Sequence, residues 1–271
     1  EILYPNPGFP IYESTIRFSG ATPIPIPLRE QNGFAFSAEE VLSKINERTR
    51  LIILNSPANP TGGVVPRGEF DALIEGLCKW PDVAIMSDEI YGQMLYDNRE
   101  HVSLIRYPEI SDRLILLDGW SKTYAMTGWR LGYSVWPEKV APHAEKLCVN
   151  IHSCVNSSAQ FAGIAALTGD QSPVKAMVSA FDERRTVIVN ELNKIPGFSC
   201  IQPGGAFYAF PNITQTGFRS DELQKKILEN AGVAVISGTS FGEHGEGYLR
   251  FSYANSTENI LKAVDLIKGC L

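Results

Sequence analysis

Lys122 is the residue whose setting in this sequence most suggests chemistry. An apolar run at 114–117 leads to this lysine, and Arg130 follows eight positions later among glycine, threonine and aromatic residues. Such a run predicts a fully buried strand, and open α/β sheets bind ligands at the carboxyl ends of their strands. A lysine ammonium in an apolar loop must pair, extend to solvent, or lose its proton and become a nucleophile. Because most lysines are simply solvated, a chemical role needs support from other motifs.

Two further apolar strands end in polar residues. The run at 51–54 leads into an Asn-Pro-Thr-Gly turn that begins at Asn59, and the run at 83–87 ends at Asp88, three residues before Tyr91. Each motif has an ordinary explanation, because Asn-Pro and Gly-Gly pairs form turns and aspartate often caps a helix. The functional interpretation instead places the Asn59 amide over a ligand oxygen and a carboxylate at the end of a strand.

The fourth motif is an arginine in an alternating strand. Leu249 and Phe251 flank Arg250, so a strand here places the arginine on the face opposite to its two apolar neighbours. An exposed strand arginine is the ordinary explanation. A guanidinium also matches a carboxylate with two parallel hydrogen bonds, which makes Arg250 a candidate for substrate binding.

Taken together, these motifs resemble the fold-type I pyridoxal-phosphate enzymes, and specifically the class I and II aminotransferases of the aspartate aminotransferase type. The matching segments are Asn59-Pro60-Thr61-Gly62, Asp88-Glu89-Ile90-Tyr91, Ser121-Lys122 with Arg130, and Arg250-Phe251-Ser252. They occur in the family's order and span most of the chain. The resemblance implies an α/β fold in which helices sandwich a mostly parallel sheet, with a smaller α+β domain at the C-terminus. It also implies a homodimer.

The resemblance implies that pyridoxal 5'-phosphate is the cofactor and that three residues act in catalysis. Lys122 would form a Schiff base with the cofactor aldehyde and would move a proton at the substrate α-carbon, which requires a lowered pKa. Asp88 would pair with the pyridine nitrogen and keep it protonated, which strengthens the ring as an electron sink. Tyr91 would hydrogen-bond the phenolic oxygen of the ring.

The remaining residues would bind the cofactor and the substrate. Asn59 would share the phenolic oxygen and also contact the substrate, while Arg130, helped by Ser121, would hold the phosphate. Arg250 would bind the substrate α-carboxylate through two parallel hydrogen bonds, a geometry that a lysine matches less well. Phe9 lies in a proline-rich segment and resembles the family's aromatic residue that stacks on the cofactor ring.

The expected activity is transfer of an amino group between an L-amino acid and a 2-oxo acid. Arg250 predicts an α-carboxylate but says nothing about the substrate side chain, so aspartate- or aromatic-type donors with 2-oxoglutarate rest on family analogy. The same scaffold also hosts lyases and decarboxylases, because the cofactor performs the difficult chemistry. A further alternative is a non-catalytic relative that senses a ligand or serves as a scaffold, although no helix-turn-helix segment of a regulator is visible.

Composition agrees with a globular enzyme. The 271 residues are 44% hydrophobic and 20% charged, which suits one large domain and one smaller domain. The net charge of −6, without blocks of one sign, gives no support for binding to nucleic acid or to an anionic membrane. Five cysteines without a Cys-x-x-Cys pair favour reduced thiols in the cytoplasm. The four histidines show no metal spacing.

Strands and helices alternate along the chain, as a doubly wound sheet requires. We expect residues 1–195 to form the cofactor-binding domain, ending in a long helix from Pro173 to Leu192, and residues 196–271 to form the small domain. Strands are expected near 2–4, 51–54, 83–87, 114–118, 131–135, 206–210, 233–236 and around Arg250. Helices are expected at 37–46, 67–79, 138–149, 157–168, 220–231 and 257–268.

The first residues look like the middle of a strand in the cofactor domain. A full member of the family carries an arm, a first strand and a phosphate-binding loop before this point, and such a loop holds phosphate with backbone amides at a helix N-terminus. We therefore expect a chain that lacks its N-terminal portion, whose activity is open to question. Some members of the family have a phosphate-binding serine where this sequence has Gly119, so Arg130 is expected to carry more of the phosphate binding.

Overall fold

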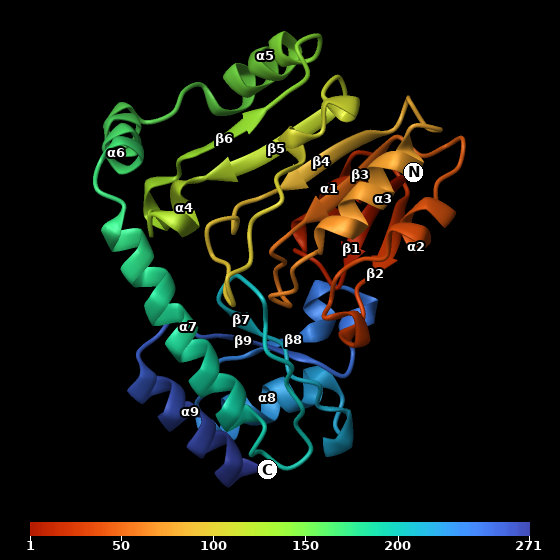
Figure 1. Ribbon diagram of the computed structural model, residues 1–271. Coiled ribbons are helices and arrows are strands. Elements are labelled where there is room, and N and C mark those ends of the chain that lie inside the picture. The colour runs from red at the N-terminus through yellow and green to blue at the C-terminus, as the bar shows by residue number, and fades with distance from the viewer.

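The computed structural model describes all residues from 1 to 271 and contains a central six-stranded sheet (Figure 1). Its spatial order is β2-β1-β3-β4-β5-β6, in which neighbours are parallel except for β6, which runs antiparallel to β5. This mostly parallel sheet with helices confirms the predicted fold class. The strands are β1 (Ile2–Asn6), β2 (Pro23–Pro27), β3 (Leu51–Asn55), β4 (Ala84–Asp88), β5 (Leu114–Gly119) and β6 (Gly132–Val135).

Helices cover the sheet because its strands are apolar on both faces. The helices α2 (Ala38–Ser43) and α3 (Arg67–Leu77) pack on one face, where Leu73 joins a core cluster with Ile52 and Ile85. A separate, smaller cluster lies around α1 (Ile11–Phe18) and contains Tyr4, Tyr12, Ile16 and Ile53. Because Ile52 and Ile53 are adjacent in β3, they point to opposite faces of the sheet. The two clusters therefore lie on opposite sides of β3.

A long helix connects the sheet to the C-terminal part of the chain. Figure 1 shows α7 (Ser172–Leu192) running from the end of α6 (Ser157–Thr168) down to the small sheet, with α9 (Thr257–Cys270) beside it. The small sheet is antiparallel in the order β7-β9-β8. Its elements are β7 (Tyr208–Ala209), α8 (Ser220–Ala231), β8 (Ile236–Ser237) and β9 (Leu249–Ser252).

The C-terminal half of α7 belongs to the core of the small sheet. Ile188 and Leu192 share a cluster with Leu223, Leu249 and Ile260. The division between residues 1–195 and 196–271 stays a prediction, and α7 contributes core residues to the second part as well as connecting the two.

The remaining helices differ in how much they bury. The short α4 (Trp120–Thr123) follows β5 and carries Lys122. The helix α5 (Ala141–His152) has no buried residue, and α6 buries only Ala159 and Gly163. All four residues of β6 are exposed as well. This end of the sheet therefore presents a large apolar surface that nothing in the single chain covers.

Three of the strands and α-helices were absent from the sequence-based prediction: the strand β2, the helix α1 and the four-residue helix α4. The strand β2 reads Pro-Ile-Pro-Ile-Pro, and proline argues against a central strand because it lacks an N–H donor. It is tolerated here because β2 lies at the edge and pairs only with β1. The second missed element is α1, a helix of eight residues that follows a segment rich in turn-forming proline and glycine.

Two strands of the small sheet are shorter than predicted or displaced. The strand expected at 206–210 is only Tyr208–Ala209, because Ala206 adopts a left-handed backbone with φ of 58° that cannot continue a strand. The strand expected at 233–236 lies at Ile236–Ser237. The other predicted strands and helices occur within about three residues of their expected ends.

None of the helices combines the length and apolarity that crossing a bilayer requires. No group of three or more histidine, cysteine, aspartate and glutamate side chains is arranged to hold a metal ion. All five cysteines are free thiols.

Candidate active site

A cavity of about 410 Å³ lies at the carboxyl ends of β3, β4 and β5. It is the place where ligands bind in open parallel sheets. The structure brings to this one cavity all eight of the side chains that the sequence motifs nominated. They are Phe9, Asn59, Asp88, Tyr91, Ser121, Lys122, Arg130 and Arg250.

The strand register sets one wall of the cavity. Asn55 and Asp88 are paired neighbours at the ends of β3 and β4. The Asn55 amide donates to the Asp88 carbonyl oxygen at 2.9 Å, and its own oxygen accepts from the Asn59 backbone N–H at 3.0 Å. Asn55 therefore fastens the turn that carries Asn59 to the strand that carries Asp88.

Asp88 is a carboxyl group with few polar neighbours. It accepts hydrogen bonds from the Tyr12 hydroxyl at 2.5 Å and from the Ile90 N–H at 3.3 Å. Burial raises the pKa of the Asp88 carboxyl, and these two hydrogen bonds offset the rise only in part. A cationic group beside Asp88 would favour its ionised form, so this position suits the partner of a protonated ring nitrogen.

Lys122 lies on α4, just past the end of β5, among aromatic rings. Its Nζ is 5.9 Å from the Tyr91 ring centroid and 5.6 Å from the Phe207 ring centroid. Burial lowers the pKa of the Lys122 amine, and the positive charges of Arg130 and Arg250 lower it further. These effects favour the neutral amine, which is the nucleophilic and proton-accepting form.

Arg250 is held against aromatic rings, and one of its buried donors has no partner. Its guanidinium carbon lies 4.7 Å from the Tyr208 ring centroid and 4.8 Å from the Phe241 ring centroid, and its Nη1 donates to the Asn59 side-chain oxygen at 3.0 Å. The buried Nε has no hydrogen-bond partner. Leaving a buried donor unpaired costs about 1–3 kcal/mol, so Arg250 is prepared for an anionic ligand. Leu249 and Phe251 are buried, which confirms the predicted alternation of β9.

Arg130 lies at the end of a loop that is held by hydrogen bonds between its own residues. Its Nη1 donates to the Thr127 carbonyl oxygen at 2.9 Å, and the Thr127 hydroxyl donates to the Ser121 carbonyl oxygen at 2.9 Å. These bonds fold the segment from Ser121 to Arg130 back on itself at the mouth of the cavity. The exposed guanidinium therefore offers positive charge to a ligand such as a phosphate.

Phe9 contributes an edge of the cavity. Its ring contacts the Tyr12 ring edge to face, with centroids 5.7 Å apart, and it is 41% exposed. An aromatic side chain that is this exposed has a free surface for a ligand. Its stacking on a cofactor ring stays a prediction.

Sequence reasoning missed several residues of the cavity. The most informative is Tyr208, whose hydroxyl lies 2.8 Å from that of Tyr91 and whose ring supports Arg250. Asn55 could have been found, because it is the first polar residue after a buried strand. Nothing in the local pattern marks Tyr12 or Tyr208, because their partners are distant in sequence. The other residues missed are Ile90, Leu117, Asp118 and Thr127.

Comparison with known proteins gives the family. A family model described as aminotransferase class I and II matches residues 1–267. The chain belongs to the class I and II aminotransferases. This match covers nearly the whole chain and confirms the resemblance that the four motifs suggested.

Among the relatives of this aminotransferase chain are aspartate aminotransferases. The protein of that name from Pyrococcus horikoshii is 40% identical over 273 residues, which cover 100% of this chain and 69% of the relative. The one from Bacillus subtilis is 37% identical and covers 99% of this chain and 69% of the relative. The chain thus spans about two thirds of the length of these relatives.

Solved structures of aminotransferases share the fold. An aromatic aminotransferase from Pyrococcus horikoshii superposes with a TM-score of 0.95 at 33% identity, covering 99% of this chain and 72% of that chain. An aspartate aminotransferase from Thermus thermophilus, solved with maleate, superposes with a TM-score of 0.91 at 32% identity and covers 100% of this chain and 69% of that one. The chain is therefore an aminotransferase by sequence and by fold.

Proposed function

We propose that this aminotransferase moves the amino group of an aspartate- or aromatic-type L-amino acid to a 2-oxo acid such as 2-oxoglutarate. The observation that carries the proposal is one cavity that holds both a nucleophilic amine, Lys122, and a guanidinium with an unpaired donor, Arg250. The names of the relatives, aspartate aminotransferase and aromatic aminotransferase, support this substrate class.

The cavity's side chains fit pyridoxal 5'-phosphate in charge and in kind. Asp88 offers a buried carboxyl for the ring nitrogen, Lys122 an amine for the aldehyde, and Arg130 a cation for the phosphate. When bound, this cofactor supplies an electron sink for negative charge that develops at the substrate α-carbon. Ser121 would assist Arg130, Phe9 would cover the ring, and Tyr91 with Asn59 would bind its phenolic oxygen.

Lys122 would move the proton at the substrate α-carbon. A general base works best when its pKa lies near the working pH, and burial together with two neighbouring cations lowers the Lys122 pKa in that direction. The aromatic rings of Tyr91 and Phe207 flank the amine. They restrict water around it and so preserve its neutral form.

Arg250 would bind the α-carboxylate of both the amino acid and the oxo acid. Its guanidinium is oriented before the substrate arrives, because Tyr208 supports it from below and Asn59 accepts one of its hydrogen atoms. A carboxylate would supply the missing acceptor for the buried Nε. This arrangement selects substrates by the group common to all of them and leaves the side chain to other residues.

The test of the proposal begins with the purified chain and added pyridoxal phosphate. We expect a visible absorbance band that changes when aspartate or phenylalanine is added, and oxaloacetate or phenylpyruvate as product when 2-oxoglutarate is also present. Borohydride reduction followed by peptide mapping should find the cofactor on Lys122. The Lys122→Ala variant should carry none, and attachment at any other lysine would overturn the assignment.

We propose in addition that the protein is a cytoplasmic homodimer. The exposed apolar residues of α6 include Phe161, Ile164 and Leu167, which follow one another at the spacing of a single helix face. Contiguous apolar surface on a folded chain marks an interaction site, and a second copy of this chain is the partner that we propose. Free thiols at all five cysteines agree with a reducing compartment.

A further inference from the structure

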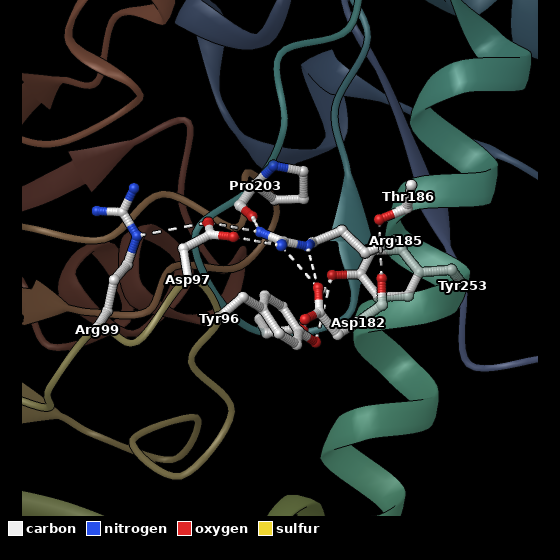
Figure 2. Close-up of polar contacts among 9 residues, drawn as sticks. Tyr96, Asp97, Arg99, Asp182, Arg185, Thr186, Pro203 and Tyr253 are labelled. Atoms are coloured by element: carbon white, nitrogen blue, oxygen red, sulfur yellow. Dashed lines mark hydrogen bonds and ion pairs between the residues drawn. The ribbon is translucent and has the colours of Figure 1, made fainter.

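An ion cluster centred on a buried arginine lies outside the cavity, at the junction of three segments (Figure 2). At its centre is Arg185 of α7, which is only 2% exposed. Its guanidinium forms two hydrogen bonds with Asp97, at 2.9 and 2.7 Å, and pairs with Asp182 one turn earlier in α7 at 2.6 Å. It also donates to the Pro203 carbonyl oxygen at 2.8 Å. The Tyr96 ring lies against the guanidinium, with 4.4 Å between the central carbon and the ring centroid.

The cluster uses the full geometry of an arginine. A guanidinium carries five N–H donors in a fixed plane, and here Nε, Nη1 and Nη2 all donate to acceptors from three different segments. A lysine ammonium has only three donors and no planar fork, so it could not make the four hydrogen bonds that Arg185 makes to Asp97, Asp182 and Pro203. Arg185 therefore joins these segments in a way that another cation would not reproduce.

The two segments that Arg185 joins to α7 lie side by side and continue into the cavity. The Ala206 N–H donates to the Met94 carbonyl oxygen at 2.9 Å, and the Tyr96 N–H donates to the Gly204 carbonyl oxygen at 3.1 Å. The Tyr253 hydroxyl donates to the Ala206 carbonyl oxygen at 3.1 Å. The segments 91–97 and 203–208, here called the two ribbons, therefore pair through an antiparallel bridge between Leu95 and Gly205.

At their inner ends these ribbons carry two residues of the cavity. Tyr91 and Tyr208 meet there through their hydroxyls at 2.8 Å, and the Tyr208 ring supports the Arg250 guanidinium at 4.7 Å. We propose that Arg185 is a positioning residue for substrate binding. Arg185 holds Asp97 of one ribbon and Pro203 of the other. It thereby keeps Tyr208 against Arg250 and fixes the position of the guanidinium that binds the substrate carboxylate.

The first test measures the ribbons themselves and needs no cofactor. We would compare amide hydrogen exchange in the unmodified chain, Arg185→Lys and the matched control Arg184→Lys, which is the same substitution at the neighbouring position of α7. Exchange at Tyr96, Gly204 and Ala206 should be roughly tenfold faster in Arg185→Lys, because the ribbons open locally more often. Unchanged exchange in Arg185→Lys, or the same acceleration in Arg184→Lys, would overturn the proposal.

A milder variant covers the case in which Arg185→Lys does not fold. Asp97 is 49% exposed, so Asp97→Asn weakens the cluster without leaving a charge unpaired in the core. The same amides should exchange faster in this variant, with the thermal midpoint of unfolding nearly unchanged. Protection at these amides equal to that of the unmodified chain would contradict the role assigned to the cluster.

The second test measures KM for the substrates, and it rests on the proposed function. With pyridoxal phosphate bound, Arg185→Lys should raise the KM for both the amino acid and the oxo acid roughly tenfold, because small displacements of binding groups have effects of this size. Its kcat should change less than about twofold. A purely structural role would lower the amount of active enzyme and hence kcat, with KM unchanged, and that result would overturn the proposal.

A double substitution completes the test. Asp97→Asn and Arg185→Lys should have non-additive effects on KM, because both substitutions change the same cluster. Additive effects would show that the two residues act independently, which would contradict the proposal. If the unmodified chain shows no turnover at all, the proposed function fails, and the exchange measurements alone decide whether Arg185 holds the ribbons.

Discussion

At Lys122 three physical effects act in the same direction. Burial, Arg130 and Arg250 all favour the neutral amine and lower its pKa below the ordinary value of 10.5. The neutral fraction at a given pH rises as the pKa falls, so the amine should react with an aldehyde at a lower pH than an ordinary lysine. We predict that the midpoint of Lys122 labelling by formaldehyde and borohydride, followed by peptide mapping against pH, lies below 10.5.

The contribution of Arg130 to the lowered pKa of Lys122 can be measured separately. In Arg130→Gln one positive charge is removed, and the midpoint of Lys122 labelling should move upward. The exposed Lys225 of α8 serves as an internal control for reagent quality in the same digest. A midpoint that stays in place in Arg130→Gln would show that the charge of Arg130 does not contribute to the lowered pKa of Lys122.

Arg250 offers a prediction about binding rather than rate. Arg250→Lys keeps the positive charge but loses one of the two parallel hydrogen bonds that a guanidinium makes to a carboxylate. A hydrogen bond to a charged group contributes about 1.5–3 kcal/mol. We predict that KM for amino and oxo acids rises roughly ten- to a hundredfold, with a smaller change in kcat. Steady-state kinetics with both substrates would check this, and an unchanged KM would exclude Arg250 as the carboxylate site.

The turn between β3 and α3 shows why the sequence motif ends in glycine. Gly62 has φ of +68°, and a Cβ at this position would lie 2.4 Å from the Pro203 Cβ and 2.9 Å from the Tyr208 carbonyl oxygen. Its own carbonyl oxygen accepts from the N–H groups of Gly204 and Gly205, both at 3.0 Å. The motif turn therefore supports the segment that carries Tyr208, and only glycine permits this contact.

The role of this turn can be tested with a matched pair of substitutions, Gly62→Ala and Gly20→Ala. Both glycines have left-handed backbone, which costs an alanine about 1–2 kcal/mol, but a Cβ at Gly20 would meet no atom within 4 Å. We predict that Gly62→Ala lowers the free energy of unfolding more than Gly20→Ala and alone raises KM. Denaturant titration and kinetics would check this, and equal effects of the two substitutions would contradict it.

The apolar end of the molecule yields a prediction about the whole assembly. Phe161 is 74% exposed on α6, and a stable interface usually buries about 800 Å² on each partner. We predict that the unmodified chain sediments as a dimer and that Phe161→Asp shifts it to a monomer. Leu228→Asp, at an exposed apolar position on α8, is the control and should leave the dimer intact. A monomeric unmodified chain would overturn the proposed homodimer.

Much of the architecture was predictable because local pattern and global fold agree. The apolar runs that became β3, β4 and β5 are continuous rather than alternating, as is typical of parallel strands covered on both faces. Residues of β3 are buried on both faces, while one face of β4 and of β5 is only half-buried. The helices α6 and α8 lie within the predicted residues. The edge strand β2 was not predictable, because its prolines are acceptable only at a sheet edge and that position depends on the order of the strands.

The family, the eight nominated side chains and the strand ends that carry three of the four motifs could all be recognised in the amino-acid sequence alone. Those features are local, since each motif needs particular residue types at a fixed spacing. The contacts between these side chains follow from the packing of the whole chain. The contacts of Tyr208 with Arg250, of Tyr12 with Asp88 and of Arg185 with Asp97 all join residues more than 40 positions apart. Such contacts depend on how the strands and ribbons pack, and no short stretch of sequence encodes that packing.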